Sequence, residues 1–425
     1  MRRAEGGGAE DGGAEDGGAE DGGDLTPPRR FLLGASLVLI GFNLRIPIAS
    51  LGPVLPEAVR ATGLSPLAAS VLTTLPSLCF GLFSPLAPAF SRRIGAERTV
   101  LLMLAALALG TVLRAVASAP ALFAAQILAC LGIAAINVLA PALMKRDFQG
   151  RAALMTGLFT MSLCLGAALS AGTIVPLQRR LGGSWSLALA AWGLPALLTL
   201  VLWAALLPRR GEVVRHIARP RSLWRDRLAW QVTLFMGLQS ALAYLVFGWL
   251  APILRDRGLS PQAAGYLLSL SILGQAVTSL IAPSLAARGR DQRGVAVLFS
   301  ALAVASLLAC LFAPPGVLWL AACLLGLSQG GLFGVALMLI VLRARDALVA
   351  AQLSAMAQGV GYLLASLGPL LAGLLHSATG GWTLVAVWIT AIGAAMAWSG
   401  AGAGRALYVG KTPESAAAIT GASAR

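Results

Sequence analysis

Stretches of about 20 consecutive apolar residues recur along this 425-residue chain, and they limit its possible folds more than any other feature. An α-helix of that length crosses the roughly 30 Å hydrocarbon core of a bilayer. Only 12% of the residues are charged, whereas soluble domains average about 25%. A transmembrane β-barrel is excluded because the chain lacks the alternation of apolar and polar residues that barrel strands require. The sequence therefore predicts an all-α integral membrane protein.

The apolar stretches predict twelve transmembrane helices from Phe31 onward. The expected spans are residues 31–56, 66–90, 99–119, 121–143, 152–177, 184–207, 229–253, 261–286, 294–313, 316–342, 347–375 and 381–403. A basic segment, 208–228, divides them six and six and is expected to be a cytoplasmic linker. We therefore predict an N-terminal six-helix bundle over 29–207 and a C-terminal six-helix bundle over 229–404.

The two ends of the chain differ from the apolar body. Within residues 1–28, the motif Ala-Glu-Asp-Gly-Gly repeats with a period of five. Such a segment has no apolar face to bury, so we expect a disordered acidic tail rich in glycine. Residues 405–425 are expected to form a second, cytoplasmic tail.

Basic residues indicate how the helices are oriented, because cytoplasmic loops carry an excess of Lys and Arg. Most of the 32 Lys and Arg residues fall in segments on the same side as the N-terminus. The opposite side holds only Arg60, Arg114, Arg179, Arg180, Arg255 and Arg257. This bias predicts a multi-pass protein of the bacterial plasma (inner) membrane with both termini in the cytoplasm. It also explains the net charge of +15, so no nucleic-acid partner is expected.

The two halves of the chain resemble each other. "GLSPLAASVLTTL" at Gly63 matches "GLSPQAAGYLLSL" at Gly258, and "MKRDF" before Gln149 matches "RARDA" before Leu348. In the two stretches that begin at Gly63 and Gly258, the Ser-Pro pair is also expected to begin a helix, with the serine as its cap. Repeats in the same direction predict two bundles related by a pseudo-two-fold axis along the membrane normal. That arrangement places a substrate site between the bundles, near the middle of the membrane.

Twelve spans in two halves with a basic central loop resemble the major facilitator superfamily. The stretches "NLRIPIASLGPVLP" (43–56), "LTTLPSLCFGLFSPLAP" (72–88) and "NVLAPALMKRDFQGRAALMTGLF" (137–159) resemble the cyanate / 2-nitroimidazole transporter family within it. The chain departs from the superfamily signature between spans two and three, where Arg92 replaces the usual Asp. The resemblance implies alternating-access transport of a small-molecule substrate across the lipid bilayer. We expect a monomer without a cofactor.

Arg45 lies near the middle of the first span, where a charged side chain costs roughly 2.5–3.5 kcal/mol. Its neighbours on the same helix face, Gly41, Ala49 and Gly52, are small and leave room for a ligand. No Asp or Glu is expected within a span, so an anionic substrate is the natural partner of the guanidinium, whose planar fork suits a small oxyanion. A structural role, with Arg45 bonded to carbonyl or amide groups, is the alternative.

Other polar side chains within the spans are candidate substrate contacts. They are Asn43, Asn137, Gln239, Tyr244, Gln329, Gln358 and Tyr362. In the superfamily that the chain resembles, spans one, four, seven and ten line the cavity, which favours Asn137, Gln239, Tyr244 and Gln329. Asn43 is about 200° from Arg45 around an ideal helix, so the two are not expected to share a ligand unless Pro47 bends the helix. An interhelical hydrogen bond is the alternative role for each residue.

Charged residues at the ends of the spans are candidates for gating or energy coupling. They are Glu57, Arg92, Arg93, Arg98, Arg146, Asp147, Arg345 and Asp346. Protons are a candidate coupling ion, and Glu57 is the best-placed carboxylate to carry them. Arg92, Arg93 and Arg98 are expected to pair with Glu97 or with helix C-termini at the inner gate.

The leading functional hypothesis is secondary active or facilitated transport of a small anionic solute, with Arg45 as its central contact. A drug or metabolite efflux carrier of the same superfamily is the alternative, although the fifth span lacks the Gly-Pro pair usual in antiporters. An enzyme is not expected, because the only histidines are His216 and His376 and no carboxylate is embedded in a span. The five cysteines all lie in apolar stretches without a metal-binding pattern, so no metal site is expected.

Overall fold

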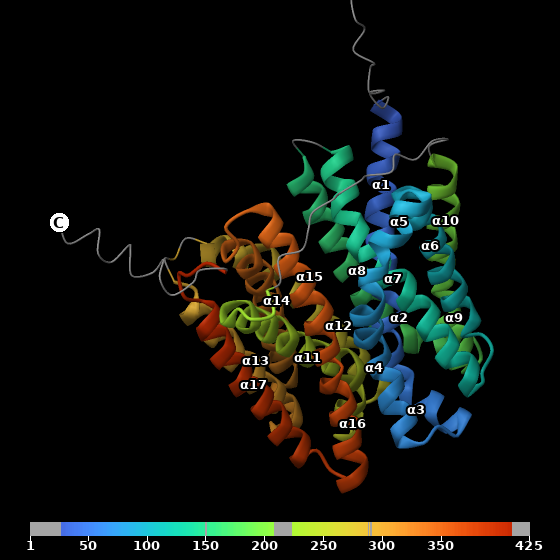
Figure 1. The fold of residues 1–425 in the computed structure, drawn as a ribbon. Coiled ribbons are helices and arrows are strands. Elements are labelled where there is room, and N and C mark those ends of the chain that lie inside the picture. The colour runs from blue at the N-terminus through green and yellow to red at the C-terminus, as the bar shows by residue number, and fades with distance from the viewer. Residues whose placement is uncertain (1–26, 149–150, 208–222, 288, 290, 410–425) are drawn as a thin grey trace, which may run out of the picture.

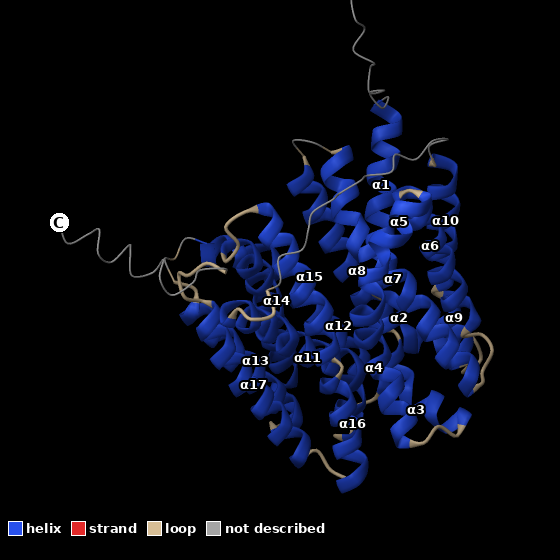
Figure 2. Cartoon of the chain, in the orientation of Figure 1, coloured by secondary structure: helices blue, strands red, loops and turns tan. Residues whose placement is uncertain are grey.

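The computed structural model describes residues 27–148, 151–207, 223–287, 289 and 291–409, and the regular structure in this part of the chain is entirely helical (Figures 1 and 2). The first half contains α1 (Pro27–Leu44), α2 (Ile46–Ala49), α3 (Leu51–Thr62), α4 (Pro66–Phe83), α5 (Ala87–Ile94), α6 (Ala96–Leu113), α7 (Ala119–Asp147), α8 (Ala152–Arg180), α9 (Trp185–Ala191) and α10 (Gly193–Leu206). The second half contains α11 (Arg227–Asp256), α12 (Pro261–Ala287), α13 (Arg293–Phe312), α14 (Leu318–Leu342), α15 (Ala347–Ala365), α16 (Leu367–Thr379) and α17 (Thr383–Ala403).

The described helices supply twelve candidate membrane spans, which confirms the predicted number. The first span consists of three segments, α1, α2 and α3, with breaks at Arg45 and Ser50. Proline explains the first break, because Pro47 has no N–H to donate and its ring clashes with the carbonyl four residues earlier. Ser65 and Ser260 cap the helices that follow them, as predicted, by accepting hydrogen bonds from Ala68 N and Ala263 N.

The third span corrects one prediction. The apolar pattern predicted a helix to residue 119, but α6 ends at Leu113. Arg114, expected on the outer surface, turns inward instead and is fully buried. The positive charge of this residue therefore lies within the first bundle and not among the outer loops.

The spans form two six-helix bundles that lie side by side in Figure 1, the first blue to green and the second yellow-green to red. Between them runs a seam to which the first bundle contributes α2, α3, α4 and α8. The second bundle contributes α11, α12, α15 and α16. Residues 1–26, 208–222 and 410–425, which include most of the predicted tails and linker, lie outside the described part of the chain. The predicted domain limits differ slightly from the helices, since α1 begins at Pro27 and α11 at Arg227.

The molecule has two ends along the helix axes, the terminal end and the distal end. The terminal end contains the start of α1 and the end of α17, and the distal end contains the end of α3 and the end of α11. In Figure 1, α1 lies at the top and α3 lies near the bottom. Among the described residues, the side-chain hydrogen bonds between the bundles lie at the distal end. Arg255 binds Glu57, and Arg179 Nη1 donates to Gln262 Oε1 at 2.8 Å.

Candidate substrate site

Arg45 occupies the first break of the first span. It is the N-cap residue of α2, with φ −109° and ψ −7°, and its side chain is half-buried. The guanidinium carbon lies 5.3 Å from the centre of the Phe247 ring, which belongs to α11 of the other bundle. Within the described part of the chain, the guanidinium forms neither an ion pair nor a hydrogen bond. Arg45 therefore presents five N–H donors at the seam between the bundles.

Phe247 belongs to a cluster of four aromatic rings, one from the first bundle and three from the second. Phe80 of α4 lies 6.0 Å from Tyr244 of α11 and 5.4 Å from Tyr362 of α15, measured between ring centres. Tyr244 also contacts Phe247 at 6.3 Å and Tyr362 at 6.2 Å. Arg45 is close enough to both tyrosines for electrostatic interaction. The cluster combines a cation with aromatic faces, a surface suited to a flat anion.

The two tyrosines were predicted as site residues, and the structure brings both near Arg45. Their hydroxyls have no hydrogen-bond partner among the described residues, so they are available to a ligand. The two phenylalanines were not predicted. An apolar aromatic residue inside an apolar stretch carries no mark of its function in the sequence.

Three of the predicted contacts are hydrogen-bonded within their own bundle. Asn43 donates to Thr199 Oγ1 at 2.9 Å and to Pro195 O at 3.4 Å, both in α10, which turns it away from Arg45. Gln239 donates to Ser240 Oγ at 2.7 Å, and Gln358 donates to Ser354 Oγ at 2.8 Å. Asn43 thus forms the interhelical hydrogen bond that was its alternative role, whereas Gln239 and Gln358 bond to residues of their own helices.

The remaining two predicted contacts are polar groups without such partners. Gln329 of α14 is 5% exposed, and its Nε2 has no hydrogen-bond partner in the described part of the chain. Asn137 of α7 is half-buried. About three helical turns separate it from Gln126, so both lie on the same face of α7.

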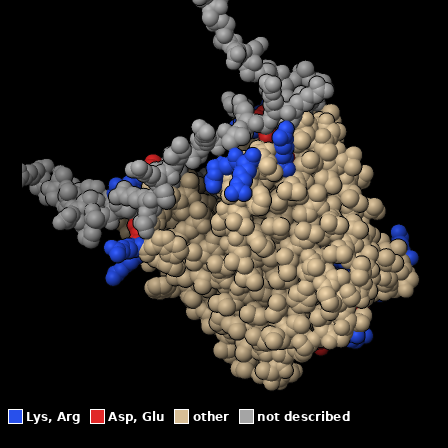
Figure 3. All heavy atoms as spheres, turned by 45° about the vertical axis from the view of Figure 1, so that its right-hand side comes forward, with Lys and Arg blue, Asp and Glu red and all other residues tan. Residues whose placement is uncertain are grey.

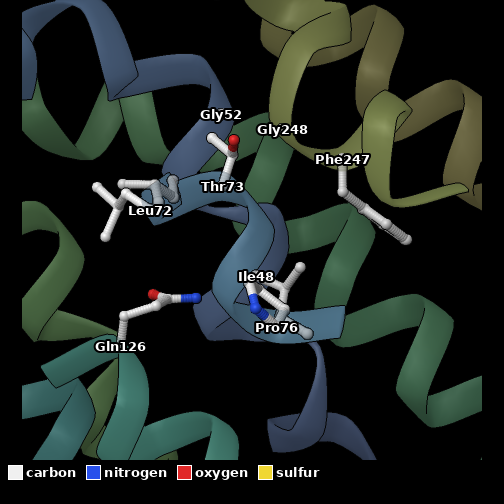
Figure 4. Close-up of a pocket in the computed structure, with 9 residues that line it drawn as sticks. Ile48, Gly52, Leu72, Thr73, Pro76, Gln126, Phe247 and Gly248 are labelled. Carbon is white, nitrogen blue, oxygen red and sulfur yellow. The ribbon is translucent and has the colours of Figure 1, made fainter. Parts of the chain in front are cut away.

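A small pocket shares Phe247 with the Arg45 site, because this residue forms part of the pocket wall (Figure 4). It has room for about one water-sized group. Its lining comes from both bundles and consists of Ile48, Leu51, Gly52, Leu72, Thr73, Pro76, Gln126, Phe247 and Gly248. The pocket therefore extends the Arg45 site into the first bundle, as far as α7.

Glu57, the predicted coupling carboxylate, joins the bundles at the distal end. Arg255 Nη1 and Nη2 donate to the two carboxylate oxygens, each at 2.7 Å, and Nη1 also donates to Pro53 O at 3.1 Å. Such a bidentate pair is geometrically specific. The pair is partly buried, with side-chain exposures of 14% for Arg255 and 21% for Glu57, so bulk solvent screens it only partly.

Replacing Glu57 by Gln should weaken closure of the distal end by about 1 kcal/mol, a roughly five-fold shift toward a distally open state. Spin labels at the exposed positions Ala61 and Ala378 would report this as a larger population of long distances. Exchanging the charges, with Glu57→Arg and Arg255→Glu together, should restore the original distribution. An unchanged distribution in Glu57→Gln would show that the pair does not hold the bundles together.

Charged residues at the terminal end interact within single bundles. Arg146 pairs with Glu97 and with Asp147, each at 2.6 Å, and Asp346 accepts a hydrogen bond from Val349 N to cap α15. Glu97 thus pairs with Arg146, and the expected pairing of Arg92, Arg93 and Arg98 with Glu97 or with helix C-termini stays a prediction. Among the described residues, no ion pair joins the bundles at this end.

The other predicted gate residues lie at the same end. Arg92, Arg93, Arg98 and Arg345 are exposed, with Arg92 and Arg93 in the last turn of α5, where cations are favourable. Figure 3 shows Lys and Arg side chains gathered near this end of the molecule. A further arginine, Arg343, was not predicted. It donates to Gln292 Oε1, Ala403 O and Gly404 O, and burial lowers the pKa of its guanidinium.

Comparison with known proteins bears on both fold and function. The family model of the Major Facilitator Superfamily matches residues 31–363. The 2-nitroimidazole transporter of Escherichia coli (strain K12) is 37% identical over 388 residues, which cover 90% of this chain and 97% of the relative. The cyanate transport protein CynX of the same organism is 32% identical over 359 residues, with 82% and 91% covered.

The chain belongs to the Major Facilitator Superfamily. The resemblance to this superfamily, and to its cyanate and 2-nitroimidazole transporters, is thereby confirmed. Like these relatives, the chain is a multi-pass membrane transporter of small molecules.

Solved structures of the superfamily share the fold. A bacterial homologue of the human lysosomal transporter Spinster has a TM-score of 0.69 at 15% identity, with 89% of this chain and 93% of that chain covered. The D-xylose-proton symporter has a TM-score of 0.67 at 15% identity, with 90% and 99% covered. At this level of identity the likeness concerns the fold alone.

Proposed function

We propose that this transporter carries a small planar anion across the plasma membrane by alternating access, with Arg45 as the central contact. One observation carries the proposal. Arg45 lies at the seam between the bundles without a carboxylate partner among the described residues. A cation within a membrane span requires compensation, and a bound anion supplies it. The ring of Phe247 packs against one face of the guanidinium in a cation–π contact and leaves the N–H donors at the edge of the guanidinium free.

The shape of the site supports a flat substrate. Phe80, Tyr244, Phe247 and Tyr362 offer ring faces and edges from both bundles, so a planar ligand can stack while its charged group meets Arg45. The relatives are named for 2-nitroimidazole and cyanate, which are small solutes, and this supports a small substrate.

The contacts between the bundles support the proposal of alternating access. Among the described residues, the hydrogen bonds between the bundles lie at the distal end. The bundles are therefore in contact at this end, as expected for a distally closed state. The excess of basic residues at the terminal end supports its placement in the cytoplasm, so this state would open inward. Protons are the proposed coupling ion, and the functional unit is proposed to be a monomer.

Thermal unfolding of the purified full-length protein tests the substrate class. Cyanate and benzoate should raise the unfolding temperature, whereas the neutral analogue benzamide should not, because it lacks the charge that Arg45 requires. A ligand at 100 times its dissociation constant stabilises by about 2.7 kcal/mol, a shift that such an assay detects. Equal shifts with benzoate and benzamide, or no shift with either anion, would refute an anion site.

A further inference from the structure

A second guanidinium lies inside the first bundle, close to the segment that carries Arg45. Arg114 is 0% exposed, and its Nη2 donates to Pro47 O at 2.8 Å and to Gln126 Oε1. Its Nε and Nη1 are buried without a partner among the described residues. Both acceptors are neutral, so the positive charge of Arg114 is not cancelled by the groups it binds.

Close helix packing allows Arg114 to reach these acceptors. A Cβ at Gly110 of α6 would lie 2.6 Å from Ala129 N of α7, so only glycine permits this separation of the two helices. The carbonyl of Pro47 precedes the second break of the first span, at Ser50, where the helical hydrogen-bond ladder is interrupted. Arg114 thus binds the backbone two residues beyond Arg45 and restrains the segment that carries it.

The contact with Arg114 also determines how the Gln126 amide is oriented. Arginine has only donors, so the Gln126 oxygen must face it and the Nε2 group must point the other way. Figure 4 shows that nitrogen on the side of Ile48, within the lining of the pocket. The acceptor of Nε2 in the protein is Cys130 Sγ at 3.6 Å, a weak acceptor that leaves amide donor capacity unused.

We propose that this pocket is a second polar subsite of the transporter, in which Gln126 Nε2 donates to a hydrogen-bond acceptor atom of the bound anion. Arg114 is the positioning residue, since it orients the Gln126 amide and holds the Pro47 carbonyl. Phe247 links the two subsites because it contacts Arg45 and also lines the pocket. The inference rests on the proposed function, and the pocket's size restricts the group that enters it to about one heavy atom.

Gln126→Glu separates this role from a structural one. The carboxylate keeps the shape of Gln126 and pairs with Arg114, so the fold should be retained. It offers the pocket an acceptor and a negative charge in place of a donor, so an anion should bind less well. We expect the half-saturation concentration for uptake of cyanate or benzoate into proteoliposomes of the full chain to rise at least ten-fold. The maximal rate should change less than three-fold.

Matched variants identify the cause of any change. Gln178→Glu makes the same substitution at the distal end, where Gln178 donates to Gly183 O, and should leave the half-saturation concentration unchanged. Arg114→Met should raise it, because the Gln126 amide becomes free to turn, and Arg114→Lys should restore it in part. A purely structural role would lower the unfolding temperature of Arg114→Met without changing half-saturation, and that result would overturn the inference.

Failure of this inference can be told from failure of the proposed function. If Arg45→Ala loses uptake while Gln126→Glu keeps the original half-saturation concentration, the subsite is wrong and the anion carrier stands. If Arg45→Ala transports the probe as the unmodified chain does, or if the unmodified chain transports neither probe, both proposals fall. A ten-fold rise in Gln126→Glu, with Gln178→Glu unchanged, supports both.

Discussion

Uptake of cyanate or benzoate should be abolished when Arg45 is replaced by alanine, with the protein still folded in the membrane. The guanidinium is the cation that the structure places at the seam without an anionic partner among the described residues. Without it, an anion entering the site would lose its charge-assisted hydrogen bonds and remain poorly solvated. Removal of the charge should not destabilise the fold, because the cation itself costs roughly 2.5–3.5 kcal/mol within the membrane.

Arg45→Lys is the informative control for this experiment. Lysine keeps the charge but not the planar fork, so uptake should persist with a half-saturation concentration at least ten-fold higher. Size-exclusion chromatography and thermal unfolding would establish that both variants are folded. Uptake by Arg45→Ala at the original rate would refute the assignment of Arg45 as substrate contact.

Gly52→Val should also abolish transport, in this case because it prevents the distal end from closing. A Cβ at Gly52 would lie 2.6 Å from Phe247 O, a backbone atom of the other bundle that cannot move aside as a flexible side chain would. Overpacking of this kind costs typically 1–3 kcal/mol. The strain applies only when the distal end is closed, so it should shift the population about 5–150-fold toward the distally open state.

The spin labels at Ala61 and Ala378 measure this shift directly, in a background without the native cysteines. Gly52→Val should show mainly long distances. Gly157→Val provides a matched control, since a Cβ at Gly157 meets nothing within 4 Å. A closed distance distribution for Gly52→Val, or transport at the original rate, would show that the close approach of α3 and α11 is not required.

Much of the Arg45 site was predictable because its signals are local. A charge in the middle of an apolar stretch stands out in the sequence, and Pro47 indicates a break nearby. Tyr244 and Tyr362 were identified as polar residues within spans, and both lie by Arg45. Asn43, Gln239 and Gln358 carry the same signal but bind groups within their own bundle, so polarity alone does not separate a site residue from a packing residue.

Arg114 and Gln126 show where prediction from the sequence stopped. Apolar residues follow Arg114, so the pattern extended the third span to residue 119 and left Arg114 at its outer end. The early end of α6 at Leu113 was not visible in the sequence. Gln126 is a single neutral polar residue in α7, and its importance depends on a partner from another helix. The same holds for Glu57, whose pairing with Arg255 joins residues far apart in the chain.

By itself, the sequence determined the class of protein, the twelve spans, their division into two halves and the presence of an arginine within the first span. These properties follow from the free energy of moving each segment from water into hydrocarbon, which depends on the composition of that segment. The tertiary structure alone decided which side chains meet: Arg45 with Phe247, Arg114 with Gln126 and the Pro47 carbonyl, and Glu57 with Arg255. Such contacts depend on helix breaks, rotations and close approaches at glycine, which arise only when the helices pack together.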